Sequence, residues 1–139
     1  MDVYDRATRS YVMSRIRGRD TRPELVLRKL LWKMGIRGYR VHAKIPGRPD
    51  VVFSGKRLAV FVQGCFWHGC RRCAIPTPTT HRAYWSKKIA GNRRRDRRTA
   101  NALRRTGWKT VVIWEHEIRK NPERCVCRVA DGLNRTHDN

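Results

Sequence analysis

Carboxylate side chains are scarce in this sequence. Only 11 aspartates and glutamates stand against 33 lysines and arginines in 139 residues, which gives a formal net charge of +22. This excess indicates a polyanionic partner. Arginine supplies 25 of the 33 cations, and its guanidinium group makes paired hydrogen bonds to phosphate and to guanine edges, which favours nucleic acid over a membrane surface. A ribosomal-type protein, basic only for RNA packing, is the alternative on charge alone.

Long apolar runs and an apolar leader are also missing. No segment approaches the roughly 20 residues of a membrane-spanning helix, and the first six residues lack the hydrophobic stretch of a secretory signal. Hydrophobic residues still make up 40% of the chain, which excludes a disordered basic tail because such tails have little to bury. We expect one compact cytoplasmic domain over 21–139, preceded by a basic arm over 1–20 that orders on DNA.

The cysteines are odd in number, five in all, and without a sign of export they do not indicate a disulfide framework. Cys65, Cys70 and Cys73 lie within nine residues. The two-residue spacing of the last pair lets both thiolates bind one tetrahedral zinc ion. Reduced, unliganded thiols are the alternative. The fourth ligand is open at this point, and the candidates are His116, His68, Cys125 and Cys127.

Hydrophobic patterning predicts an α/β domain. A helix is expected from Thr21, where 21–24 resembles a capping box with Pro23 in the first turn, to Gly35. Strands are expected at 39–42, 50–53, 58–62 and 110–114, with a hairpin turn at 54–57. The 58–62 strand is apolar on both faces, which predicts a central position in the sheet. A loop over 63–80, a helix over 81–106 with a basic middle at 93–98, and a weakly patterned tail from Arg119 complete the chain.

Three side chains are candidates for chemistry. Asp50 follows a turn and opens a strand, and a carboxylate fixed beside DNA phosphates needs a cation, for which Mg²⁺ is the natural choice. Glu24 could add a second carboxylate, although its capping-box role is sufficient by itself, and Asp50 could merely cap its turn. His68 directly follows the central strand and suits a general base near neutral pH, with zinc binding as the alternative.

Phe66, Trp67 and Trp85 are large aromatic residues next to basic segments. Such side chains can wedge between base steps and unstack them. Burial in the core is the alternative for each one, but two adjacent aromatics in a loop rich in glycine and cysteine favour exposure for Phe66 and Trp67.

These features resemble the Vsr family, the very short patch repair DNA mismatch endonucleases. The Gly47–Asp50 sequence GRPD and the Gly64–His68 sequence GCFWH are the most specific matches. The resemblance covers roughly residues 2–118, and its segments are 5–10 with Met13, 20–24, 46–50, 64–68, Asn92 with 95–98, and 107–115. It implies a restriction-endonuclease-like fold, with a central mixed β-sheet flanked by helices and a structural zinc site.

The resemblance also implies Mg²⁺-dependent nicking of one strand on the 5′ side of the thymine in a T:G mismatch left by deamination of 5-methylcytosine. By position, Asp50 would bind two catalytic Mg²⁺ ions, with the backbone carbonyl of Val62 as a further ligand. His68 would act as general base toward the attacking water, and Glu24 would hold metal-bound water.

The resemblance implies that zinc is bound by Cys65, Cys70, Cys73 and His116. Beside the mismatch, Phe66, Trp67 and Trp85 would intercalate, and Met13 would enter from the other groove. The basic residues expected to bind DNA are Arg15, Arg48, Arg93, Arg94 and Arg97. In the family's pathway a DNA methyltransferase generates the lesion, and mismatch-repair proteins and a repair polymerase follow. No membrane partner is expected, and we expect a monomer.

Three positions depart from a well-known family member. Gln63 stands where that member has histidine, so an assisting imidazole is absent or replaced by an amide. Cys70 stands where that member has histidine, and His116 stands where it has cysteine, which preserves the number of zinc ligands. Two alternatives to mismatch nicking stay open: a sequence-specific nicking or restriction-type endonuclease that needs no mismatch, and a non-catalytic, zinc-stabilised nucleic-acid-binding module.

Overall fold

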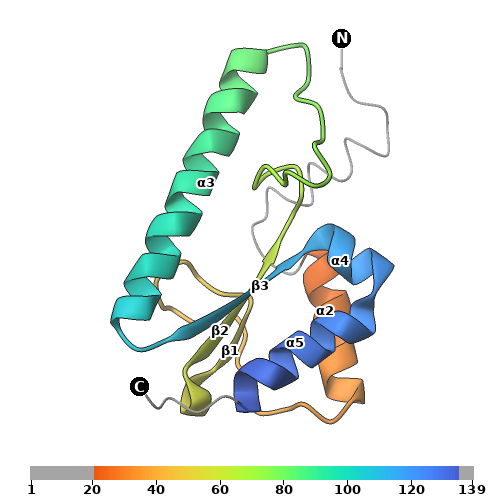
Figure 1. Cartoon of the computed structure of the whole chain (residues 1–139), viewed down its shortest axis with the longest axis vertical. Helices are drawn as coiled ribbons and strands as arrows, with labels where there is room; N and C mark the ends of the chain where they lie inside the picture. The colour runs from red at the N-terminus through yellow and green to blue at the C-terminus, as the bar shows by residue number, and fades with distance from the viewer. Residues whose placement is uncertain (1–20, 135–139) are drawn as a thin grey trace.

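The computed structural model describes residues 21–134. The expected arm over 1–20, with Met13 and Arg15, lies outside the described residues. The elements in chain order are α2 (Arg22–Lys33), β1 (Val51–Phe53), the short 3₁₀ helix η1 (Ser54–Lys56), β2 (Leu58–Gln63), α3 (Arg82–Arg105), β3 (Lys109–Trp114), α4 (Glu115–Lys120) and α5 (Pro122–Asn134) (Figure 1).

A three-stranded mixed sheet forms the centre, in the order β1-β2-β3. Strands β1 and β2 are antiparallel, with Val51 opposite Val60, and β2 and β3 are parallel. The predicted central position of β2 is confirmed, because its apolar side chains on both faces need cover on both sides. The strand expected at 110–114 is present as β3, which lies at an edge of this sheet and in which only Ile113 is buried.

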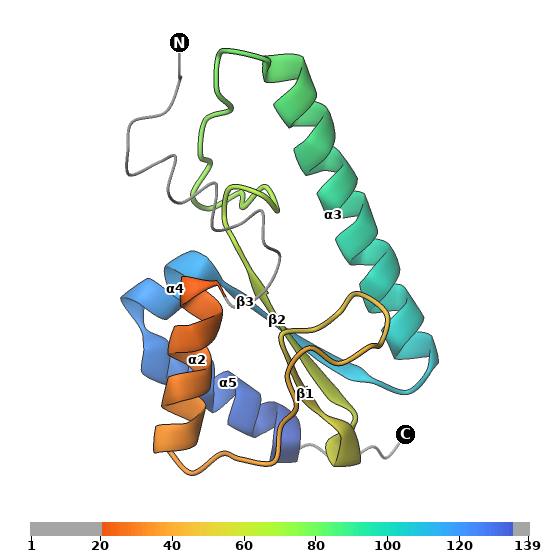
Figure 2. The same ribbon diagram turned by 180° about the vertical axis from the view of Figure 1, so that it is seen from behind.

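Helices cover both faces of the sheet. Helix α3 lies along one side, and α2, α4 and α5 pack together on the other (Figures 1 and 2). The core between the sheet and the second group is built from leucine, isoleucine and valine side chains of α2, β1, β2, β3 and α5. None of the helices within 21–134 is long and apolar enough to cross a bilayer.

Helices α2 and α3, whose ends the sequence predicts at Gly35 and at residue 106, end by the same geometry. Gly35 and Gly107 have φ angles of +81° and +86°, a left-handed conformation that glycine adopts without a steric penalty. The backbone N–H groups of Ile36 and Trp108 donate to the carbonyls of Leu31 and Leu103, which completes a Schellman motif after α2 and after α3. The predicted ends of these helices are therefore confirmed.

The expected strand at 39–42 is wrong. Only Arg40 pairs, through a single antiparallel bridge to Val52 with two backbone hydrogen bonds. Gly38 and His42 on either side have left-handed φ angles of +86° and +58°, so the backbone cannot stay extended for more than a few residues. The hairpin turn at 54–57 is confirmed, as η1 followed by Arg57 in the left-handed conformation.

The tail from Arg119 onward, expected to be weakly patterned, contains the end of α4 and the whole of α5. Cys125, Val126 and Val129 of α5 are buried in the core. At Gly132 a Cβ atom would lie 3.1 Å from Leu58 and 3.4 Å from Val111, so the glycine lets α5 lie close to the sheet. Hydrophobic patterning did not predict α5, because its buried face consists of cysteine, valine and glycine residues that lie among charged residues.

Candidate active site and metal cluster

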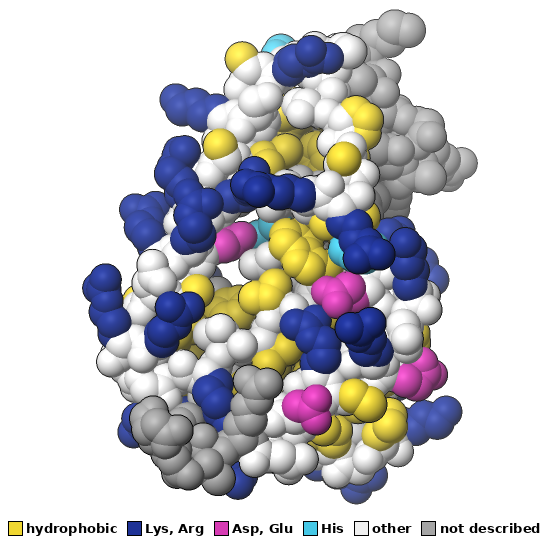
Figure 3. Space-filling model, viewed as in Figure 1, with side chains coloured by type: hydrophobic (Ala, Val, Ile, Leu, Met, Phe, Trp, Pro, Cys, Tyr) yellow, Lys and Arg dark blue, Asp and Glu magenta, His cyan; other side chains and the backbone are white. Residues whose placement is uncertain are grey.

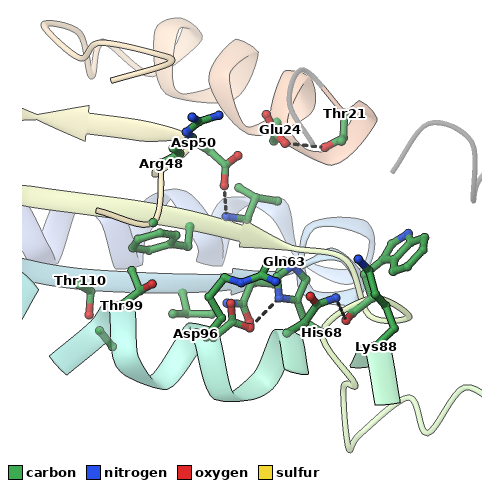
Figure 4. A pocket seen from close by; sticks show the side chains of 18 of the residues that line it. Thr21, Glu24, Arg48, Asp50, Gln63, His68, Lys88, Asp96, Thr99 and Thr110 are labelled. Carbon is green, nitrogen blue, oxygen red and sulfur yellow. Dashed lines mark hydrogen bonds and ion pairs between the residues drawn. The ribbon is translucent and has the colours of Figure 1, made fainter. Parts of the chain in front are cut away.

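A cleft of about 710 Å³ opens between the start of α2, the beginning of β1 and the side of α3. Its walls carry all three residues predicted to perform chemistry, Asp50, Glu24 and His68. In Figure 4, Asp50 and Glu24 lie on one side of the β2 ribbon, and His68 lies on the other side with Asp96. Residues separated by more than 70 positions thus line one cavity.

Asp50 is fixed at the edge of β2 by two hydrogen bonds. Its backbone N–H donates to the carbonyl of Val60 (2.9 Å), and its carboxylate oxygen Oδ2 accepts the backbone N–H of Val62 (2.6 Å). The preceding turn packs against α3 at Gly47, where φ is +80° and a Cβ atom would overlap the Thr99 side chain. The carboxylate therefore has a defined position next to Val62, whose carbonyl was the expected further ligand.

Glu24 is buried, with 4% of its surface exposed. The expected capping box is wrong, because the Thr21 side chain accepts no helix N–H and its hydroxyl instead donates to Glu24 Oε1 over 3.0 Å. Arg28, one turn later, lies 3.9 Å from Glu24 Oε2. The carboxylate is therefore held by side chains of its own helix end, and it lines the cleft together with Thr21.

His68 is paired with a residue that sequence reasoning did not select. Its Nδ1 atom lies 2.6 Å from Oδ2 of Asp96 on α3, and about a quarter of the imidazole is exposed. An ionised carboxylate can only accept, so the Nδ1–H group donates, and in the neutral imidazole the lone pair then lies on Nε2. Asp96 is the only carboxylate in the basic run 93–98, and this isolation was the signal that could have found it.

The three predicted intercalating aromatics form one cluster. The rings of Phe66, Trp67 and Trp85 meet edge to face with centroids 5.2–5.6 Å apart. The expected exposure is wrong for Phe66, which is buried with 6% exposed, because it forms the base on which the two half-buried tryptophans pack. Asn92 of α3 donates to the carbonyl of Trp67 over 2.9 Å and ties this loop to the helix.

The cysteine cluster is mostly buried, and none of its four residues lines the cleft. Ligand atoms of Cys65, Cys70, Cys73 and His116 all lie within 4.8 Å of one another. The distances from His116 Nδ1 to the sulfurs of Cys65 and Cys70 are 3.3 and 3.6 Å. Four sulfur and nitrogen donors in this arrangement can hold a metal ion, and they suit a tetrahedral structural site.

Two of the thiols differ in their acidity. Burial raises the pKa of Cys65 to about 12. For Cys70 burial acts in the same direction, but hydrogen bonds from the backbone of Cys73 and Arg72 outweigh it and lower the pKa. Of the other candidate ligands, Cys125 is buried in the core beside α2 and Cys127 is exposed.

Comparison with known proteins supports the resemblance seen in the sequence. The family model of the DNA mismatch endonuclease Vsr matches residues 1–74, more than half of the chain. The chain belongs to the Vsr family. It is therefore a DNA endonuclease of the strand-nicking kind.

Individual Vsr-family relatives carry two kinds of name. The chain is 46% identical over 112 residues to the type II nicking enzyme V.XorIIP of Xanthomonas oryzae pv. oryzae, covering 79% of this chain and 81% of the relative. It is 41% identical over 119 residues to the DNA mismatch endonuclease Vsr of Escherichia coli, covering 85% and 76%. It is 35% identical over 136 residues to the type II nicking enzyme V.NmeAIP of Neisseria meningitidis, covering 96% and 92%.

The remaining predicted residues lie at the cleft or on helix α3. Gln63, at the end of β2, is buried and lines the cavity. Arg48 lines the same cavity from the turn before β1. The α3 arginines Arg93, Arg94 and Arg97 face away from the core, where Figure 3 shows Lys and Arg side chains gathered over this helix and around a hollow.

Proposed function

We propose that this Vsr-family enzyme hydrolyses one phosphodiester bond of duplex DNA in a Mg²⁺-dependent reaction, on the 5′ side of the thymine in a T:G mismatch left by deamination of 5-methylcytosine. The observation that carries the proposal is the convergence of Asp50 and Glu24 with the His68–Asp96 pair in one cleft. In a chain with only 11 carboxylates, three of them at one cavity point to a site built for chemistry.

The donor set of the cleft fits Mg²⁺. Carboxylates and a backbone carbonyl are hard oxygen ligands, and Mg²⁺ in nuclease-type sites uses one or two carboxylates together with substrate phosphate. Asp50 and the Val62 carbonyl would hold two Mg²⁺ ions, and Glu24 would hold water of their hydration shell. When bound, the metal supplies Lewis-acid polarisation of the scissile phosphate.

His68 is the proposed general base. Because Nδ1–H donates to Asp96, the lone pair of Nε2 can accept a proton from the attacking water. Asp96 acts as a positioning residue, since it fixes the tautomer and the orientation of the imidazole. His68 would take the proton of the attacking water as the oxygen–phosphorus bond forms. The bond between phosphorus and the 3′ oxygen would break at the same time, and that oxygen would take a proton from water and leave as a 3′ hydroxyl.

Trp67, Trp85 and Phe66 are proposed to sense the mismatch. A mispaired base costs less to unstack than a matched one, and half-buried tryptophans on a rigid phenylalanine base can enter a base step with little loss of side-chain freedom. Met13, outside the described residues, is proposed to enter from the other groove, with Arg15 on the backbone nearby. Arg48, Arg93, Arg94 and Arg97 would bind phosphates.

The Cys65–Cys70–Cys73–His116 cluster is proposed to bind one structural Zn²⁺ ion. The thiolate and imidazole donors favour zinc over magnesium. Bound there, zinc would tie the loop that carries His68 to the start of α4, where His116 lies.

The wider setting follows from the same proposal. We propose a restriction-endonuclease-like fold for the domain over 21–139, with 1–20 as its DNA-binding arm, acting as a monomer in the cytoplasm. A DNA methyltransferase would create the methylated base, and mismatch-repair proteins and a repair polymerase would act after the nick.

A second candidate is a nicking enzyme that needs no mismatch, because two of the relatives are named type II nicking enzymes. The test is one assay with an end-labelled T:G duplex and its matched T:A and C:G controls, with Mg²⁺ added or omitted. We expect a nick 5′ of the mispaired thymine only with Mg²⁺ and only in the T:G duplex. Equal nicking of matched duplexes would select the second candidate, and tight binding without cleavage would select a non-catalytic module.

A further inference from the structure

A second cavity, of about 410 Å³, adjoins the cleft on the far side of His68. The two cavities share Gln63, His68 and Asp96. The second one reaches the metal cluster at Cys70 and His116, and four arginines from two separate segments line it: Arg71, Arg72, Arg93 and Arg97. Arg71 and Arg72 had no part in the expected DNA contacts.

The two segments present these arginines for local reasons. In the sequence Cys70-Arg71-Arg72-Cys73 the outer cysteines face the cluster, so the two residues between them point outward and are exposed. Arg93 and Arg97 are one turn apart on α3, hence on the same face. At Gly69, where φ is +63°, a Cβ atom would lie 3.0 Å from Arg93 Cδ and 2.8 Å from Ile89 Cγ2, so the loop backbone lies directly on the helix.

Among residues 21–134 little negative charge balances the arginines of this cavity. Asp96 is the one carboxylate that lines it, and that group is bonded to His68. Within residues 21–134 none of the four guanidinium groups takes part in an ion pair. Like charges collected around a cavity repel one another, and an anion placed among them would remove that cost.

We propose that this cavity binds a backbone phosphate of the DNA strand, next to the scissile phosphate. Arg71 and Arg72 would contact it from residues 64–73, called here the metal loop, and Arg93 and Arg97 would contact it from α3. Guanidinium groups bind phosphate through paired, charge-assisted hydrogen bonds. The inference rests on the proposed function, because a strand that places a phosphate at His68 leads into the adjoining cavity. The metal loop is thereby a DNA-binding element as well as a structural one.

The test compares two variants with the same loss of charge. Arg71→Gln/Arg72→Gln removes the loop side of the cavity, and Arg104→Gln/Arg105→Gln removes two exposed arginines at the end of α3. Affinity for a T:G duplex and a matched duplex is measured without Mg²⁺ over a range of salt concentrations. We expect the loop variant to bind both duplexes about tenfold more weakly, with a salt slope reduced by about two, and the control variant to match the wild type.

Metal content of both variants, measured on the purified proteins, must equal that of the wild type, so that a loss of affinity reports the arginines and not the cluster. A loop variant whose slope equals that of the wild type or of the control would overturn the proposal. The proposal would also be overturned if the Arg71 and Arg72 substitutions weakened binding of inorganic phosphate but left the salt dependence of DNA affinity unchanged. If the wild type binds DNA through these arginines but fails to nick the T:G duplex with Mg²⁺, the phosphate site stands and the proposed function fails.

Discussion

The candidate active-site cleft and the cysteine cluster lie next to each other and share one loop, yet they are built in opposite ways. Residues 64–73 supply His68 to the cleft and three cysteines to the cluster. In the cleft, the imidazole and its Asp96 partner are a quarter to a third exposed. In the cluster, Cys65, Cys70 and His116 are buried, with 1–8% of their surface exposed.

This difference separates the two tasks of the loop. Oxygen and imidazole groups around an open cavity can exchange water, metal and substrate, whereas a closed set of four sulfur and nitrogen donors has no position for a substrate. Changes in the cleft should therefore alter the nicking rate with little effect on stability. Changes in the cluster should alter stability first and activity as a consequence.

Asp50→Asn gives the sharpest test of the cleft. The amide oxygen can still accept the Val62 N–H, but the charge proposed to hold Mg²⁺ is lost, so we expect single-turnover nicking to fall about 10³-fold or more. The thermal midpoint should stay within about 3 °C of the wild type. Asp131→Asn, an exposed aspartate on α5, is the matched control and should keep full activity. Retained nicking in Asp50→Asn would remove Asp50 from the metal site.

Cys65→Ala tests the cluster, where we expect a change in stability to come before any change in activity. We expect the bound zinc to fall from one ion per chain to well below half, and the thermal midpoint to drop by roughly 10 °C, because metal binding contributes directly to folding free energy. Metal analysis and thermal unfolding measure both. Cys127→Ala, at an exposed cysteine outside the cluster, should leave both values unchanged. Wild-type stability without metal would show that the cluster is not structural.

Asp96→Asn sharpens the comparison within the cleft. Without a carboxylate partner the imidazole of His68 loses its fixed orientation, so we expect kcat to fall about 10- to 100-fold. Affinity for the T:G duplex should not weaken, since the change removes a negative charge near DNA. A purely structural role would instead lower the thermal midpoint and the affinity together.

Gly69→Ala tests the contact where the shared loop meets α3. The left-handed φ and the short contacts to Ile89 and Arg93 predict a loss of about 1–3 kcal/mol of unfolding free energy. Denaturant unfolding measures it. Gly55→Ala in η1, where a Cβ atom meets nothing within 4 Å and φ is not in the left-handed range, should change stability by less than about 0.5 kcal/mol. Equal effects at the two glycines would contradict the close packing of the loop.

The sequence predicted the helix ends and the central strand correctly, because at these places the residue type suits only one local structure. The glycines at 35 and 107 ended α2 and α3 as expected, and the doubly apolar 58–62 segment became the central strand. Signals failed where context competed. The left-handed φ of His42 limits the strand predicted at 39–42 to a single bridge. Helix α5 was not predicted because its buried face contains Cys125 and Gly132, which are not typical core residues of a helix.

By itself the sequence determined the polyanionic partner, the order of the main strands and helices, and the residues able to act as acid, base and ligand. These properties depend on composition, periodicity and side-chain chemistry, which are local. Only the tertiary structure decided that Asp96 pairs with His68, that Glu24 lines one cleft with Asp50, and that Arg71 and Arg72 line one cavity with Arg93 and Arg97. Such contacts join residues that are far apart in the chain or that have several local options, and the path of the backbone selects among them.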